Sequence, residues 1–255
     1  MNKQKSSRIK INIRPVSRLR KAYIARLVGR CVILAGCIFL SVFGSSEFEL
    51  LDGMNFFSRF SVLHILWGIW VVDMICQLVP VKHMPLGSQK LFRERFRPVH
   101  KEINYSRLKD YIISTRRAAC KVFALWTVLI AVIGALFHAN IINRTVLFLI
   151  SVFFYVCDLI CVLVWCPFRL ILGNRCCTTC RIFNWDHLMM FSPLIFIGGF
   201  YSISLVLMAC VVWLVWEFCV MRFPERFWEF SNEALKCSHC TDKLCTQYCK
   251  NYGSS

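Results

Sequence analysis

Five long apolar stretches dominate this chain of 255 residues. Four of them, at residues 23–43, 57–79, 118–142 and 146–166, each hold roughly the 20 apolar residues that a helix needs to cross a bilayer. Backbone N–H and C=O groups in lipid must be satisfied within the protein, and single stretches of this length achieve that as α-helices. With 57% hydrophobic residues, the chain is also too apolar for a soluble domain. The sequence therefore predicts an all-α integral membrane protein.

The fifth stretch, at residues 188–220, has two interpretations. As one helix it would be about 50 Å long, more than a bilayer requires, and Pro193 with Gly198 and Gly199 interrupts its first third. We expect an interfacial or re-entrant half-helix over 188–197, then a span over 200–220, giving five spans and a C-terminus outside. The alternative is a tight hairpin of two short crossings, which gives six spans and a C-terminus inside.

The basic residues indicate the orientation of the spans. Residues 1–30, 80–121 and 168–187 together hold 24 of the 31 lysines and arginines, and all three segments fall on one side of the predicted spans. Short loops rich in lysine and arginine face the cytoplasm. We therefore expect a multi-pass protein of the cell membrane with a cytoplasmic N-terminus. Arg26 and Arg30, in the first turns of the first span, are expected to extend to the interface.

The chain then divides into segments that alternate between membrane and water. In order, these are a basic cytoplasmic arm (1–22), a transmembrane hairpin (23–79), a basic loop (80–117), a second hairpin (118–167), a cysteine-containing loop (168–187), the broken final segment (188–220) and a cysteine-rich tail (221–255). The basic arm and loop are expected to attract anionic lipid rather than nucleic acid.

The second and fourth spans carry a similar motif. Both contain Asp-x-Ile-Cys-x-Leu-Val, followed by proline, a basic residue and Leu-Gly, which predicts a tandem two-helix repeat. The repeat places Asp73 and Asp158 at equivalent depths, where carboxylates rarely face lipid. They are candidates to line a central cavity, with His64 or His138 as further intramembrane polar groups; helix–helix hydrogen bonding is the alternative role.

Two cysteine clusters lie in polar segments. Each contains C-x2-C: Cys177 with Cys180, and Cys237 with Cys240. Two such pairs can form a tetrathiolate site for zinc or an iron–sulfur cluster, with Cys245 as a substitute ligand. A shared site requires both clusters to emerge on the same face of the membrane. Disulfide formation, or no metal at all, remains open.

The segment NRCCTTCRIFNWD at 174–186, the later PERF at 224–227 and the cysteine tail resemble an uncharacterised family of bacterial polytopic membrane proteins. The resemblance covers mainly the C-terminal third of the chain. It implies a bacterial cell membrane protein and transfers neither an activity nor a residue role.

Three functions follow as hypotheses. The first is a membrane protein with a cysteine-ligated zinc or iron–sulfur site at the membrane surface, in a redox, metal-sensing or structural role. The second is a small-solute or ion transporter that uses Asp73 and Asp158. The third is a non-catalytic scaffold that binds a membrane protein partner or a second copy of itself. No catalytic residue is identified, so the sequence does not decide whether the chain is an enzyme.

Overall fold

The computed structural model describes residues 17–100, 102–174 and 176–244, and within them the chain is helical without a strand. The α-helices are α1 (Arg18–Phe43), α2 (Val62–Leu78), α3 (Leu86–Gln89), α4 (Tyr105–His138), α5 (Arg144–Leu163), α6 (Phe168–Leu172), α7 (Asp186–Phe191) and α8 (Phe200–Arg222). The 3-10 turns are η1 (Ser45–Leu51), η2 (Asn55–Phe57), η3 (Arg93–Arg95), η4 (Cys177–Thr179), η5 (Phe183–Trp185), η6 (Ser192–Phe196), η7 (Pro224–Phe227), η8 (Glu233–Leu235) and η9 (Cys237–His239).

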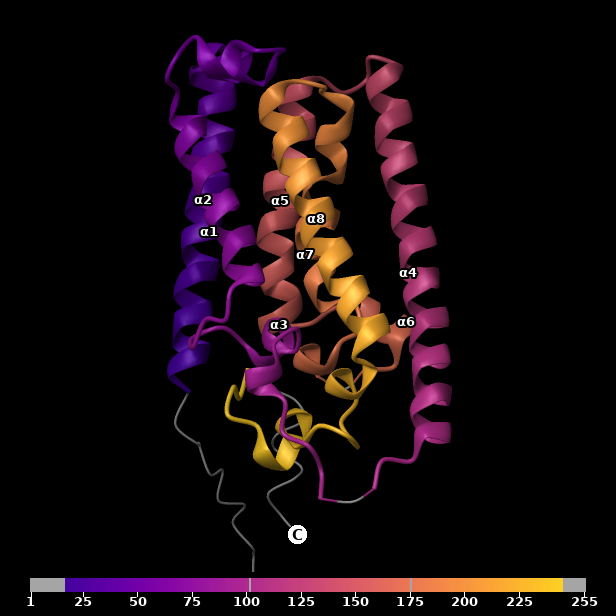
Figure 1. The fold of residues 1–255 in the computed structure, drawn as a ribbon. Helices are drawn as coiled ribbons and strands as arrows, with labels where there is room; N and C mark the ends of the chain where they lie inside the picture. The colour runs from indigo at the N-terminus through magenta and orange to yellow at the C-terminus, as the bar shows by residue number, and fades with distance from the viewer. Residues whose placement is uncertain (1–16, 101, 175, 245–255) are drawn as a thin grey trace, which may run out of the picture.

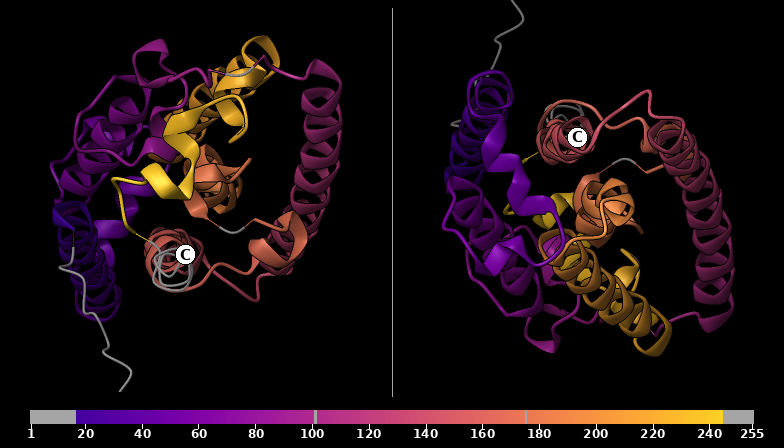
Figure 2. Two further views of the ribbon diagram at one scale, coloured as in Figure 1. Left: turned by 90° about the horizontal axis from the view of Figure 1, so that it is seen from below. Right: turned by 90° about the horizontal axis from the view of Figure 1, so that it is seen from above.

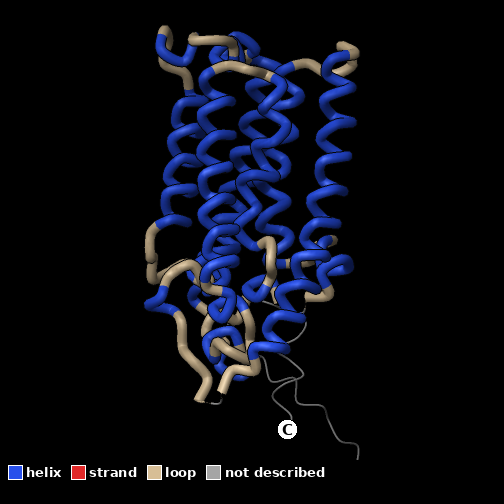
Figure 3. The backbone as a smooth tube through the Cα atoms, turned by 45° about the vertical axis from the view of Figure 1, so that its right-hand side comes forward, coloured by secondary structure: helices blue, strands red, loops and turns tan. Residues whose placement is uncertain are grey.

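The long helices run alongside one another between two ends of a bundle (Figures 1 and 3). In the described residues, four helices, α1, α4, α5 and α8, are long and apolar enough to cross a membrane, and α2 is a shorter apolar helix. This supports the predicted membrane class. We call the end at which α1 begins the proximal end, and the opposite end the distal end.

Polar caps fix where these helices begin. Ser17, Ser61, Asn104 and Asn143 each accept a hydrogen bond from the first turn of the helix that follows. Such side chains satisfy backbone N–H groups that have no partner inside the helix. The local sequence therefore sets the starts of α1, α2, α4 and α5 before any packing is considered.

Two features differ from the sequence-based expectation. Helix α4 begins at Tyr105, well before residue 118, so residues 105–117 of the predicted basic loop form the proximal part of this one helix. The final apolar segment turns back on itself: α7 and η6 lead to the distal end, and α8 returns to the proximal end (Figure 1). This path is that of the hairpin alternative, with the tail at the same end as the start of α1.

Aromatic rings fill the centre of the bundle. Trp70 on α2 is fully buried, and its ring centroid lies 5.1 Å from that of Phe191 and 5.8 Å from that of Tyr155. Helix α1 packs on α5, α2 packs on α8, and α7 packs between α5 and α8. Helix α4 stands at the side away from α1 and α2, and contacts α6, η6 and η7 (Figure 2).

At the distal end, a close backbone approach fixes the start of α8. The Phe200 N–H donates to the Gly53 carbonyl at 2.9 Å. A Cβ atom on Gly199 would clash with the carbonyl oxygen of Leu51, so only glycine fits there. The loop that follows α1 therefore packs directly on the turn between η6 and α8.

At the proximal end, the tail packs on the loop that follows α2. The Glu233 N–H donates to the Arg97 carbonyl at 2.8 Å, and the Leu86 N–H donates to the Asp242 carboxylate at 2.8 Å. The Ser17 hydroxyl donates to the Asp242 carbonyl at 2.8 Å. These bonds place the residues before α1, the loop before α3 and the tail at one end of the bundle.

Candidate functional site

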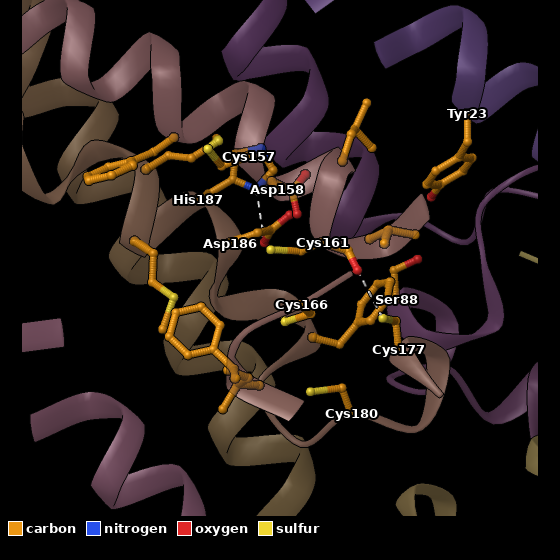
Figure 4. A pocket seen from close by; sticks show the side chains of 18 of the residues that line it. Tyr23, Ser88, Cys157, Asp158, Cys161, Cys166, Cys177, Cys180, Asp186 and His187 are labelled. Atoms are coloured by element: carbon orange, nitrogen blue, oxygen red, sulfur yellow. Dashed lines mark hydrogen bonds and ion pairs between the residues drawn. The ribbon is translucent and has the colours of Figure 1, made fainter. Parts of the chain in front are cut away.

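A cavity of about 260 Å³ lies in the proximal half of the bundle, between α1, α2, α5, α7 and the loops around α6 (Figure 4). Polar residues, sulfur-bearing residues and aromatic rings all line it. The polar lining includes Arg26, Arg30, Asp73, Gln77, Asp158, Arg169, Asp186 and His187. The sulfur lining consists of Cys157, Cys161, Cys166, Cys176, Cys177 and Cys180, with Met84, Met189 and Met190. Aromatic rings complete it, among them Trp126, Phe154 and Phe168.

Arg30 joins three helices at the wall of this cavity. Its guanidinium lies 2.7 Å from Asp158 on α5 and 3.3 Å from Asp73 on α2, and donates to the Tyr155 carbonyl at 2.6 Å. It also stacks over the Tyr155 ring, 3.7 Å from the centroid. The structure therefore brings Asp73 and Asp158 to one basic side chain. Arg30 is 8% exposed, so the expectation that it reaches the interface is wrong.

Beside this ion pair lies a group of buried polar atoms that lack partners. Gln77 donates to one carboxylate oxygen of Asp186 at 2.8 Å. In the part of the chain that the structure describes, the Gln77 side-chain carbonyl and the His187 Nε2 make no hydrogen bond. The Asp186 Oδ1 and the His187 Nδ1 lie 3.3 Å apart, at ion-pair distance (Figure 4), and His187 is 1% exposed. Buried polar atoms without partners are rare in folded proteins.

The six cysteines reach the cavity from α5 and from the two loops that follow it. Cys157 and Cys161 belong to α5, and Cys166 lies just beyond its end. The Cys177 thiol donates to the Cys161 carbonyl at 3.4 Å, and the Cys176 thiol lies 3.0 Å from the Thr178 hydroxyl. Sulfur atoms from separate segments therefore line the cavity, and Figure 4 shows Cys157, Cys161, Cys166, Cys177 and Cys180 there.

Only part of the cysteine set predicted to bind metal meets at this cavity. Cys177 and Cys180 line it, whereas Cys237 and Cys240 lie at the same end of the bundle without lining it. Cys245 lies outside the described residues. Among residues 17–100, 102–174 and 176–244, no three histidine, cysteine, aspartate or glutamate side chains are placed to hold one metal ion. Burial raises the pKa of Cys177 to about 12 and also raises that of Cys180, which favours protonated thiols at neutral pH.

The two predicted intramembrane histidines lie elsewhere. His64 belongs to the capping box of α2: its Nδ1 accepts from the Ser61 N–H at 3.0 Å, and its Nε2 lies 2.9 Å from the Phe56 carbonyl. His138 is the last residue of α4, next to Phe196. Neither histidine lines the cavity.

A second buried ion pair, which the sequence did not reveal, fixes the cysteine loop to α8. Arg181 donates to both carboxylate oxygens of Glu217, at 2.8 Å and 2.5 Å, and Trp185 donates to the first of them at 2.9 Å. Glu217 is thus a structural anchor for the residues that follow Cys180. The sequence does contain one sign of this ion pair: Glu217 is an isolated glutamate in an apolar helix, and such a charge needs a partner.

Neither a protein-family model, nor a curated protein, nor a solved structure matches this chain.

Proposed function

We propose that this membrane protein binds a small cation in the cavity beside Asp158 and Asp186, as the binding step of transport. One observation carries the proposal: the buried Gln77 side-chain carbonyl has no hydrogen-bond partner, and the Asp186 carboxylate lies beside it with Gln77 and His187 as its contacts. Carboxylates and amide carbonyls accept hydrogen bonds or coordinate cations and donate nothing when ionised. A cation is the ligand that such atoms lack.

The charges around the cavity agree with this choice. Asp73, Asp158 and Asp186 all line it. In the described part of the chain, Arg30 lies within salt-bridge distance of Asp73 and Asp158, and His187 lies 3.3 Å from Asp186. Buried charges are costly unless they are paired. A bound cation would give the Gln77 side-chain carbonyl the partner that it lacks and would be a further positive group beside Asp186.

The proposed architecture follows from the same residues. We infer that α2 also crosses the membrane, that α7 with η6 forms a short return segment, and that the proximal end is cytoplasmic. The tandem repeat is supported by the meeting of Asp73 and Asp158 at one guanidinium. The concentration of lysine and arginine in residues 1–30 and 80–121 supports the orientation. Basic segments at this end would also contact anionic lipid.

Thermal unfolding of the purified protein in detergent tests cation binding. The probes are Na⁺, Mg²⁺, Zn²⁺, Ag⁺ and tetraethylammonium. A cation that binds only the folded state raises the unfolding temperature by mass action. We expect at least one probe to do so, and the shift to disappear in Asp186→Asn. Asp110→Asn, which removes an exposed carboxylate on α4, should keep the shift. A shift that persists in Asp186→Asn, or no shift with any probe, contradicts the proposal.

Flux tests the transport step. The stabilising cation is loaded outside proteoliposomes that contain the protein, and its uptake is measured. Replacement of both Asp73 and Asp158 by asparagine should abolish uptake, because these carboxylates would line the route. Unchanged uptake in the double variant would rule out their part in transport.

A second candidate is the zinc or iron–sulfur centre shared by the two cysteine clusters. One observation favours it: the segment that holds Cys237 and Cys240 docks at the proximal end, where the loop with Cys177 and Cys180 also lies. Cys245 would be available as a further ligand. Elemental analysis of protein purified without oxygen should then find stoichiometric zinc or iron. Metal that remains after replacement of Cys237 and Cys240 by serine would count against a shared centre.

A further inference from the structure

The cavity is larger than a bare metal ion requires. Its volume is about 260 Å³, whereas a cavity needs only roughly 10–15 Å³ to hold one water. Metal ions such as Ca²⁺ and Zn²⁺ are held by several ligands in direct contact with the ion. In residues 17–100, 102–174 and 176–244, no three histidine, cysteine or acidic side chains are placed to hold one ion in this way. The size of the cavity and its ligand set therefore favour a polyatomic cation.

Most of the cavity lining is apolar. It includes aromatic rings and thioethers, among them those of Trp126, Phe154, Phe168, Met84, Met189 and Met190. Sites for organic molecules have this composition, with apolar and aromatic walls and a few polar groups that fix the orientation of the ligand. Apolar substituents that pack on such walls are removed from water, which is favourable in proportion to the area buried. A small hydrated ion gains nothing from them.

Three of the aromatic rings come together from three helices. The centroid of the Trp126 ring on α4 lies 5.0 Å from that of Phe154 on α5 and 6.3 Å from that of Phe168 on α6. The Trp126 Nε1 donates to the Ser192 hydroxyl at 3.0 Å, and this bond holds the indole in place. The faces of aromatic rings attract cations, tryptophan most strongly, and groups of such rings recognise quaternary ammonium ligands. These rings therefore suit a positively charged organic group.

A carboxylate lies close to these rings on α5. Phe154 and Asp158 both line the cavity and are one helical turn apart, so they share a face of α5 at about 5–6 Å between Cβ atoms. Arg30 contacts Oδ2 of Asp158, and an ionised carboxylate has about four lone-pair sites on its two oxygens, so acceptor capacity remains. Figure 4 shows the carboxylates of Asp158 and Asp186 in the same part of the cavity. An ammonium group can thus meet a carboxylate and an aromatic ring together.

The basic residues of the lining have contacts of their own. Arg30 lies between two carboxylates. The Arg169 Nε donates to the Asn174 carbonyl at 3.2 Å, and the Arg26 guanidinium lies over the Tyr23 ring, 5.7 Å from its centroid. Each guanidinium therefore already contacts an electron-rich group, which favours a cationic ligand over an anionic one.

We propose that the cavity binds an organic ammonium cation with apolar substituents. The charged nitrogen lies beside Asp158 and Asp186, and the substituents pack on the rings of Trp126, Phe154 and Phe168. This proposal rests on the proposed function and names the class of the cation. The flexible thioethers in the wall accommodate substituents of different shapes.

The test uses the whole protein, purified in detergent, with binding measured by titration calorimetry. Benzyltrimethylammonium is the main probe. Tetramethylammonium has the same charge without the ring, and phenylmethanesulfonate has a similar shape with the opposite charge. We expect one equivalent of benzyltrimethylammonium to bind, about tenfold more tightly than tetramethylammonium, because the ring adds buried apolar area. Phenylmethanesulfonate should not bind.

Two ring variants test the aromatic group. Trp126→Leu and Phe154→Leu should each weaken benzyltrimethylammonium binding about tenfold, because each removes a ring that the cation contacts. Trp126→Phe keeps a ring and should retain most of the affinity. The matched control is Trp165→Leu, which changes a tryptophan that is 48% exposed and does not line the cavity, and it should bind as wild type. Asp186→Asn should weaken the binding of both ammonium probes.

The unfolding temperatures of the ligand-free variants show whether each one folds. Wild-type affinity in both Trp126→Leu and Phe154→Leu would overturn the inference, as would binding of phenylmethanesulfonate as tight as that of benzyltrimethylammonium. If an inorganic cation gives a shift in unfolding temperature that Asp186→Asn removes, while neither ammonium probe binds, this inference fails and the proposed function stands. If no cation binds, both fail.

Discussion

The guanidinium of Arg30 lies 2.7 Å from the carboxylate of Asp158, although 128 residues separate them in the chain. The same guanidinium reaches Asp73 at 3.3 Å, so one basic side chain on α1 connects α2 and α5. In a bundle of apolar helices, this ion pair is a polar contact that joins α1, α2 and α5.

Arg30→Met should strongly destabilise the protein, because it leaves Asp73 and Asp158 without their cation. Removal of one partner from a buried ion pair costs about 3–5 kcal/mol. The triple variant Arg30→Met, Asp73→Asn, Asp158→Asn should recover much of the loss, because no unpaired charge remains. Thermal unfolding in detergent measures both effects.

The matched control for this change is Arg144→Met. Arg144 pairs with Asp52 at the distal end, where the two side chains are 55% and 39% exposed. Exposed ion pairs contribute little to stability. Equal unfolding temperatures for Arg30→Met and Arg144→Met would show that the buried pair does not hold the helices together.

Gly199→Ala should destabilise the distal end, because the added methyl group would clash with the Leu51 carbonyl oxygen. Overpacking of this kind costs about 1–3 kcal/mol. Gly68→Ala provides the comparison: a Cβ there meets nothing within 4 Å, and alanine favours a helix interior. We expect Gly199→Ala to unfold at lower temperature than wild type and Gly68→Ala to unfold at the same temperature or higher. The reverse order would argue against the close approach of the two turns.

The tail should lie on the same side of the membrane as the start of α1. A membrane-impermeant maleimide, followed by mass spectrometry of the labelled peptides, should modify Cys240 in inverted vesicles and leave it unmodified in intact cells. Ser58→Cys introduces a thiol at the exposed distal end and should give the opposite pattern. Labelling of both positions from the same side would be incompatible with the return path of α8.

Stability should depend on pH through Lys90. This side chain is 2% exposed, between the rings of Trp216 and Phe227, and burial lowers its pKa from 10.5 to about 7. Between these two values the unfolded chain binds one proton more than the folded protein at this position. The contribution of Lys90 to stability therefore rises as pH increases through that window and is constant below it.

The comparison that isolates this residue is Lys90→Met. The unfolding temperature of wild type, relative to Lys90→Met, should increase between pH 7 and pH 10 as the buried amine loses its proton. A difference that stays constant across this range would mean that Lys90 keeps its usual pKa in the folded protein.

The sequence predicted the apolar helices closely, because their length and composition are local properties. The start of α4 was missed because basic and apolar residues from Tyr105 onward continue one helix beyond the apolar part. Asp73 and Asp158 were recognised as a pair from the repeat, but Arg30 was not, since a basic residue near a span end usually extends to the interface. The cavity itself depends on contacts between distant segments, such as Gln77 with Asp186, which no local pattern encodes.

The bond from the Ser17 hydroxyl to the Asp242 carbonyl has a consequence for the order of events during synthesis. Helix α1 is synthesised before the other helices, but the residue that accepts the Ser17 hydrogen bond lies 225 residues further along the chain. Insertion of the remaining helices must therefore precede completion of the proximal end. A ribosome-bound chain that stops short of Asp242 would therefore have its helices inserted while the Ser17 hydroxyl still lacks this hydrogen bond.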